Sequence, residues 1–201
     1  DGFDVEGLPA SGGNPVFANR PANCADSELA GRARKVGAVI WGKTNVPFML
    51  SDFQSYNEIY GTTNNPYDVS RVPGGSSGGA TAALAAGITP LEIGSDIGGS
   101  LRHPANFCGV CSLKPTWGVL PMRGHVPPPP GFDAEVDLGV GGPMARNVDD
   151  LKFLWSVLSG TQEQKRRDAK GARIAVWDGQ TGWPLDDSVK ARVEASADAL
   201  Q

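Results

Sequence analysis

The chain has 201 residues, of which 40% are apolar and 20% charged, and this is enough for one domain with a substantial core. Its formal net charge of −4 provides no electrostatic basis for binding nucleic acid or an anionic membrane surface. No uninterrupted apolar stretch is long enough to cross a bilayer, so we expect neither nucleic acid nor a membrane as a partner.

The first part of the chain predicts a loop followed by a helix and a strand. Residues 1–25 are loop-like, and the pair Asp26–Ser27 then offers an N-cap for a helix over 28–36, which Gly37 ends. Residues 38–41 follow as a short buried strand. This order of helix, glycine and strand predicts an α/β architecture.

The elements predicted downstream follow from apolar spacing and capping residues. They are a buried helix over 80–86, a strand over 90–93, a helix capped by Asn147 or Asp149 and running through 158, a strand over 173–177 and a helix over 188–200. Four consecutive prolines at 127–130 predict a stiff polyproline segment. No linker divides the chain into two domains.

Two glycine loops that contain serine, residues 74–79 and 94–100, are the most informative feature of the chain. Glycine allows positive φ and close approach of the backbone to a ligand, and successive N–H groups in such turns can form a nest for negative charge. A serine in such a nest has its hydroxyl where a developing oxyanion would be held, which indicates acyl transfer by a serine nucleophile. The alternative, that both loops are only tight turns, is weaker for two such loops joined by a helix of small residues.

Other chemistries fit the first loop less well. Residues 74–78 satisfy the G-x-S-x-G pattern of the α/β-hydrolase nucleophile elbow, but that motif should follow a strand, and Pro73 disfavours a central strand there. A phosphate-binding loop would need a Lys-Ser or Lys-Thr pair to complete the glycine loop at 74–79, and none follows it.

The three cysteines, Cys24, Cys108 and Cys111, argue against a disulfide framework because their number is odd. A reducing compartment, and hence a cytoplasmic location, is the simpler inference. Cys108 and Cys111 have one half of a zinc spacing without a second half, so we interpret them as buried structural thiols and expect no metal.

The chain resembles the amidase signature enzymes in an ordered series of motifs that covers about residues 1–160. The motifs are GKTNVP at 42–47, PGGSSGG at 73–79, GSDIGGSLR at 94–102, PA at 104–105, CG at 108–109, LKPT at 113–116 and GPMAR at 142–146. The series is far more specific than any single motif in it.

The resemblance implies an α/β fold with a mixed central β-sheet flanked by helices, of which this chain is an incomplete part. It implies a Ser–cis-Ser–Lys catalytic set in which Ser100 is the nucleophile and Ser76 is the bridging serine, with a cis peptide at Gly75–Ser76 or Ser76–Ser77. The oxyanion hole would be formed by the backbone N–H groups of Ile97, Gly98, Gly99 and Ser100. Met49 corresponds to a substrate-binding position, with core packing as the alternative.

The same resemblance implies a catalytic lysine immediately ahead of Asp1, which is not in this chain. Lys43 and Lys114 lie inside the motifs, but the pattern places neither as the base, so we interpret both as structural, with a substitute base as the alternative. We therefore expect residues 1–201 to be one amidase domain, truncated at both ends and inactive on its own.

A Ser-His-Asp esterase using Ser76 or Ser77 would need His103 or His125, the only two histidines. We expect a loop or substrate-side role for each histidine, and simple polar surface residues are an equal alternative. Asp96 is expected to bond its own loop rather than to act on substrate.

These features together predict an amide-bond hydrolase that forms an acyl-enzyme with a small-molecule amide and uses no cofactor. The alternatives are a non-catalytic fragment or partner-binding subunit of the same fold, and a glutamine-dependent transamidation subunit, which would need a partner protein and tRNA. A homo-oligomer is left open.

Overall fold

The computed structural model describes residues 1–125, 137–161, 171–177, 182 and 184–200. The chain forms two compact units, residues 1–164 and 165–201. The second unit contains α5 (Asp187–Asp198), which begins where the Asp186 side chain accepts the Ser188 N–H at 2.9 Å. This confirms the predicted C-terminal helix, although no side chain of α5 is buried.

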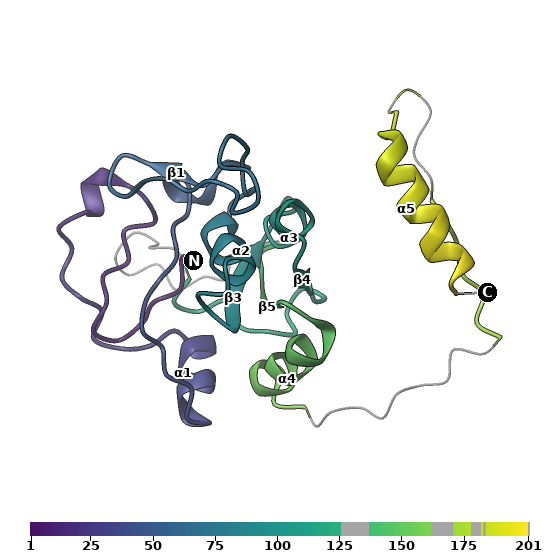
Figure 1. Cartoon of the computed structure of the whole chain (residues 1–201). Helices are drawn as coiled ribbons and strands as arrows, with labels where there is room; N and C mark the ends of the chain where they lie inside the picture. Colours follow the sequence, from purple (N-terminus) through teal and green to yellow (C-terminus); the bar gives the residue numbers. More distant parts are fainter. Residues whose placement is uncertain (126–136, 162–170, 178–181, 183, 201) are drawn as a thin grey trace. The chain divides into compact units, whose positions relative to one another are not determined.

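A three-stranded antiparallel sheet lies at the centre of the first unit (Figure 1). Its order is β3 (Leu91–Asp96), β5 (Val140–Ala145) and β4 (Cys111–Ser112). The register of β3 and β5 runs from Leu91 opposite Ala145 to Asp96 opposite Val140. Since β3 runs directly into the second glycine loop, the sheet fixes where that loop begins.

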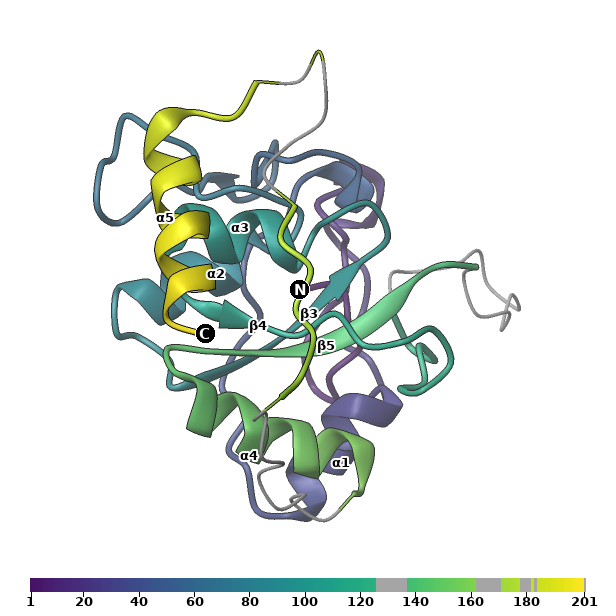
Figure 2. The same ribbon diagram turned by 90° about the vertical axis from the view of Figure 1, so that its right-hand side faces the viewer.

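Helices lie on both sides of this sheet, as the two views of Figures 1 and 2 show. On one side, α1 (Glu28–Lys35) and α4 (Val148–Ser159) enclose a core that contains Leu29, Leu154 and Leu158. On the other side, α2 (Gly78–Ala85) and α3 (Arg102–Cys108) enclose a second core. The predicted α/β class is confirmed.

None of the helices in the described ranges has the length and apolar character that a bilayer crossing needs.

The remaining short elements lie in the turn-rich segments of the first unit. They are the 3₁₀ helices η1 (Pro15–Phe17) and η2 (Phe48–Leu50) and the antiparallel pair β1 (Tyr56–Asn57) and β2 (Gly61–Thr62).

The capping residues identified in the sequence begin the helices as predicted. Ser27 Oγ accepts the Ala30 N–H at 3.3 Å, and Asn147 Oδ1 accepts the Asp150 N–H at 2.9 Å. Helix α2 begins two residues earlier than predicted and includes Gly78 and Gly79. A Cβ on Gly78 would collide with the Ser55 hydroxyl, and one on Gly79 would collide with the Asn45 backbone, so glycine is required for this helix to pack so closely.

Two predicted strands are wrong. Residues 38–41 and 173–177 have no regular secondary structure. The burial predicted for residues 38–41 is also absent, since the exposed fraction is 84% for Val39 and 66% for Trp41. A strand needs a partner for its N–H and C=O groups, and no strand among the described residues pairs with either segment.

Strand β5 was not predicted, although it is the central strand and all six of its residues are buried. Its Gly141–Gly142–Pro143 sequence has low β-propensity, which hides it from an analysis of apolar periodicity. A Cβ on Gly141 would meet Leu29, and one on Gly142 would collide with the Leu113 carbonyl, so the fold requires these glycines for close packing on both faces.

Candidate active site

The two glycine loops, far apart along the chain, are joined by a backbone hydrogen bond. The Ser77 N–H donates to the Ser100 C=O at 3.3 Å. The first loop leads into the N-terminus of α2, and the second connects β3 to α3. Ser76 is 1% and Ser100 is 8% exposed, and the Gly75–Ser76 peptide is cis, one of the two positions expected. The structure therefore brings the two predicted catalytic serines into neighbouring loops.

The four serines of these loops differ in what their hydroxyls bind. Ser77 Oγ donates to Asp1 Oδ2 at 2.6 Å, and Ser95 Oγ donates to Asp1 Oδ1 at 3.0 Å. The hydroxyls of Ser76 and Ser100 make no hydrogen bond within the described part of the chain. The role of Ser76 as a bridging serine beside the nucleophile Ser100 thus stays a prediction, while the Ser77 hydroxyl is occupied and a poor candidate for a nucleophile.

Ser55 supports the first loop from outside and was missed in the sequence. Its buried hydroxyl lies 3.2 Å from both the Gly74 and Ser76 carbonyl oxygens, and it accepts the Gly78 N–H at 3.0 Å. A single serine in a polar, turn-rich segment carries no local signal of this role, because all of its partners are about twenty residues away along the chain.

Asp96 shapes the second loop, as expected from the sequence. Its buried carboxylate accepts the Gly99 N–H at 2.8 Å and the Leu101 N–H at 3.0 Å, and it pairs with Arg102 Nη2 at 2.9 Å. Burial by itself would raise the pKa of the Asp96 carboxyl, but the hydrogen bonds from Arg102 and the two amides outweigh it and hold that pKa below its usual value.

This geometry corrects the predicted oxyanion hole in one respect. The Gly99 N–H already donates to Asp96, so it is not a free donor for an oxyanion. The N–H groups of Ile97, Gly98 and Ser100 make no hydrogen bond in the described residues and can still serve as donors. Gly99 has φ of 127°, and a Cβ there would collide with the His103 ring, so this position requires glycine.

The two histidines have different surroundings, and neither bonds Ser76 or Ser100. His103 is exposed and lies edge-on to Phe53, with ring centroids 4.7 Å apart. His125 is not a surface residue: its side chain is almost fully buried against Phe3, and Nε2 lies 3.2 Å from Asp1 Oδ1. Burial lowers the pKa of His125 to about 3, so it is neutral at pH 7 and donates Nε2–H to Asp1.

Neither lysine of the motifs contacts the serine pair through a hydrogen bond. Lys43 Nζ lies 3.5 Å from the Pro9 carbonyl oxygen, and Lys114 Nζ donates to the Pro115 carbonyl at 2.9 Å. Burial lowers the pKa of Lys43.

Met49 lies in η2 with φ of 50°, and its N–H donates to the Gly12 carbonyl at 2.7 Å. Its substrate-binding role stays a prediction.

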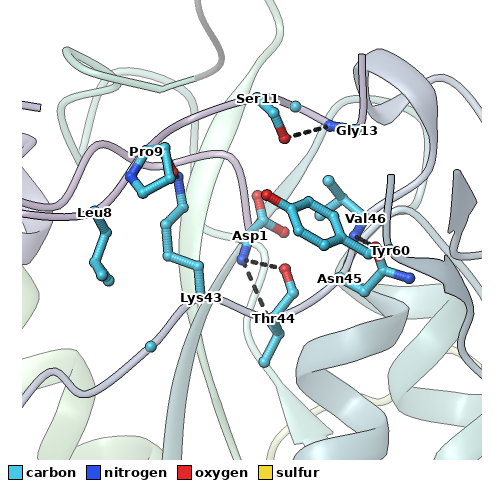
Figure 3. A pocket seen from close by; sticks show the side chains of 12 residues that line it. Asp1, Leu8, Pro9, Ser11, Gly13, Lys43, Thr44, Asn45, Val46 and Tyr60 are labelled. Atoms are coloured by element: carbon cyan, nitrogen blue, oxygen red, sulfur yellow. Dashed lines mark hydrogen bonds between the residues drawn. The ribbon is translucent and has the colours of Figure 1, made fainter. Parts of the chain in front are cut away.

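A cavity of about 280 Å³ lies beside Asp1 (Figure 3). The side chains of Lys43, Thr44, Asn45 and Tyr60 surround it, and neither Ser76 nor Ser100 lines it. The cavity is therefore separate from the serine pair.

Among the described residues, no group of three or more His, Cys, Asp or Glu side chains could hold a metal ion, and the three cysteines are free thiols.

Comparison with known proteins decides the family. The family model described as Amidase matches residues 1–201. The chain belongs to the amidase signature family. The chain is 41% identical over 158 residues to the AtzE subunit of 1-carboxybiuret hydrolase from Pseudomonas sp. (strain ADP), a match that covers 79% of the chain and 33% of that relative.

Two other relatives show the same partial coverage. A glutamyl-tRNA(Gln) amidotransferase subunit of Symbiobacterium thermophilum is 37% identical over 88% of the chain and 38% of its own length. The structure of 6-aminohexanoate cyclic dimer hydrolase matches with a TM-score of 0.69 at 33% identity, over 80% of the chain and 33% of that structure. The chain thus spans about a third of the length of these relatives.

We expect Asp96→Ala to distort the second glycine loop. The substitution leaves two loop amides and the Arg102 guanidinium without their acceptor, and an unsatisfied buried donor costs about 1–3 kcal/mol. The free energy of unfolding in urea, followed by tryptophan fluorescence, should fall by roughly this amount.

Asp68→Ala is a matched control for this substitution. Asp68 also pairs with a nearby arginine, Arg71, and accepts the Ser70 N–H, but its side chain is 47% exposed whereas that of Asp96 is fully buried. Water replaces the lost contacts of Asp68, so the change in stability should be much smaller. Equal losses for the two variants would show that burial of Asp96 is not what makes its contacts matter.

Proposed function

We propose that the whole protein is an amidase in which Ser100 Oγ attacks the carbonyl carbon of a small-molecule amide. The observation that most supports this is that the four loop serines differ in whether their hydroxyls have a hydrogen-bond partner. Ser77 and Ser95 have their hydroxyls engaged by Asp1, whereas Ser76 and Ser100 lie in loops joined by the Ser77–Ser100 backbone bond and have hydroxyls without a partner among the described residues. Two free hydroxyls in adjoining buried loops suit a nucleophile and a proton carrier.

The proposed reaction proceeds in two halves. As Ser100 Oγ bonds to the carbonyl carbon, its proton passes to Ser76 Oγ, and the Ser76 proton passes to the base. The base in this proposal is the lysine that the resemblance implies ahead of Asp1. The N–H groups of Ile97, Gly98 and Ser100 stabilise the tetrahedral oxyanion.

Collapse of the tetrahedral intermediate breaks the C–N bond, and the proton returns through Ser76 to the leaving nitrogen, which departs as the amine. Water then adds to the ester carbonyl of the acyl-enzyme and gives its proton through Ser76 to the base. The bond between the carbonyl carbon and Ser100 Oγ breaks, the proton returns through Ser76 to Ser100 Oγ, and the carboxylic acid is released.

A glutamine-dependent transamidation subunit is the second candidate function. Several relatives are subunits of glutamyl-tRNA(Gln) amidotransferase, including one at 37% identity over 88% of the chain. In that case the amide substrate is glutamine, and the product ammonia is used with a partner protein and tRNA.

The three free cysteines support a reducing, cytoplasmic location for either function.

Mass mapping of the acyl-enzyme tests the proposal. The whole protein, with all residues that flank this chain, is mixed with activated esters and amides of small acids, and with glutamine in a parallel arm. After an acid quench, peptides are analysed for the acyl adduct. We expect the adduct on Ser100, and an adduct from glutamine would favour the second candidate.

The control variant is Ser70→Ala, since Ser70 is an exposed serine whose hydroxyl donates to Asp68 Oδ1 at 2.6 Å, away from both glycine loops. Its adduct yield should equal that of the unmodified protein. An adduct on Ser77 would contradict the assignment of the nucleophile, and a folded protein that forms no adduct with any substrate would favour the non-catalytic alternative.

A further inference from the structure

The carboxylate of Asp1 is the centre of a buried polar cluster that joins distant parts of the first unit. Asp1 is 6% exposed, and its main-chain nitrogen lies 3.1 Å from Thr44 Oγ1 at the edge of the cavity shown in Figure 3. Nothing in the local sequence around Asp1 signals this cluster, because its side-chain partners Ser77, Ser95 and His125 lie far away along the chain.

Every oxygen of this carboxylate has a donor. Oδ2 accepts from Ser77 Oγ at 2.6 Å, and Oδ1 accepts from Ser95 Oγ at 3.0 Å and from the Gly2 N–H at 2.6 Å. Neutral His125 adds a fourth bond through Nε2 at 3.2 Å. A buried carboxylate with several donors holds them in place, because releasing one leaves a buried polar group without a partner.

The two serines in this cluster are direct neighbours of the proposed machinery. Ser77 follows Ser76 in the chain, and its N–H bonds the Ser100 carbonyl at 3.3 Å. Ser95 precedes Asp96, whose carboxylate shapes the loop from Ile97 to Leu101. Ser77 Oγ also accepts the Ser95 N–H at 3.2 Å, so the two loops and Asp1 form one closed set of contacts.

We propose that Asp1 is a positioning residue whose carboxylate, by binding Ser77 in the first glycine loop and Ser95 in the second, sets the position of Ser76 relative to Ser100. This rests on the proposed amidase function. Asp1 is not itself the base, because all its oxygens are occupied and its side chain bonds neither Ser76 nor Ser100. It acts on the reaction only through the geometry of the two loops.

Asp1→Asn and Ser77→Ala, singly and combined in the whole protein, test this role. A misplacement of about 1 Å can cost on the order of 100-fold in rate. We therefore expect each single variant to lower kcat by roughly 10- to 100-fold with KM changed much less. The rate at which a fluorophosphonate labels Ser100 should fall in parallel. Because Ser77→Ala removes a contact that Asp1→Asn already disturbs, the double variant should lose little more than Asp1→Asn alone.

Asp4→Asn is the matched control. Asp4 is a partly buried carboxylate in the same segment, and it bonds Asn23 Nδ2 at 2.9 Å but no residue of either glycine loop. Its kcat and labelling rate should equal those of the unmodified protein. Ser95→Ala removes a single donor to Asp1 and serves as the milder variant should Asp1→Asn fail to fold; it should show the same kcat-specific loss on a smaller scale.

The outcomes separate this proposal from the proposed function. If the unmodified protein is labelled on Ser100 but Asp1→Asn, Ser77→Ala and Ser95→Ala keep its kcat, the positioning role is wrong and the amidase function stands. Losses that multiply in the double variant would also overturn it, since they would show that Asp1 and Ser77 act independently. If the unmodified protein shows no labelling of Ser100, the proposed function itself fails and the positioning role fails with it.

Discussion

Ser100→Ala should abolish acyl-enzyme formation in the whole protein. The alanine has no oxygen to bond the carbonyl carbon, and the hydroxyls of Ser77 and Ser95 are poor replacements because they are bound to Asp1. Loss of a serine nucleophile lowers kcat by at least about 10⁴-fold in comparable hydrolases. Steady-state amide hydrolysis, together with mass mapping of the adduct, measures this effect.

The histidine variants show whether Ser100 is the correct nucleophile. His103→Ala and His125→Ala should retain acylation at Ser100, because neither ring is hydrogen-bonded to Ser100 or Ser76. If either histidine variant loses activity as completely as Ser100→Ala, the protein works as a Ser-His-Asp esterase and the present assignment is wrong. The unfolding midpoint of each variant separates such a loss from a loss of folded protein, which matters most for buried His125.

Ser76→Ala should leave a weak enzyme with a changed proton path. Ser100 then has no hydroxyl to receive its proton, and general acid–base assistance contributes about 10²–10⁴-fold to rate. We expect kcat for amides to fall by this amount, and the fall for activated esters to be smaller, because their leaving groups need little protonation. The comparison of amide and ester rates on one variant gives this difference directly.

Ser77→Ala is the neighbouring control for Ser76→Ala. It should lower kcat less than Ser76→Ala does, because the Ser77 hydroxyl binds Asp1 and acts on the reaction only through the position of the loop. It should also slow amides and activated esters by similar factors. A larger loss for Ser77→Ala, or one confined to amides, would transfer the proton-carrying role from Ser76 to Ser77.

The helices and the serine loops were predictable because their signals are local. Ser27 and Asn147 cap helices with their own side chains, and glycine in consecutive positions marks a loop whatever surrounds it. The α/β class followed from the order of these elements. The motif series indicated the amidase family, and the family model over residues 1–201 confirmed it.

Local sequence could not decide which segments would pair as strands or which polar groups would meet. The apolar segment 38–41 has no strand partner among the described residues, while the glycine-rich β5 is a central strand because β3 and β4 lie on either side of it. The bond between Asp1 and Ser77 joins residues 76 positions apart, and Ser55 reaches Gly74 across 19. Which serine hydroxyl is engaged and which is free depends on such distant partners. The sequence could therefore indicate the loops and their chemistry, whereas only the tertiary structure binds the Ser77 and Ser95 hydroxyls to Asp1 and leaves those of Ser76 and Ser100 without a hydrogen bond in the described part of the chain.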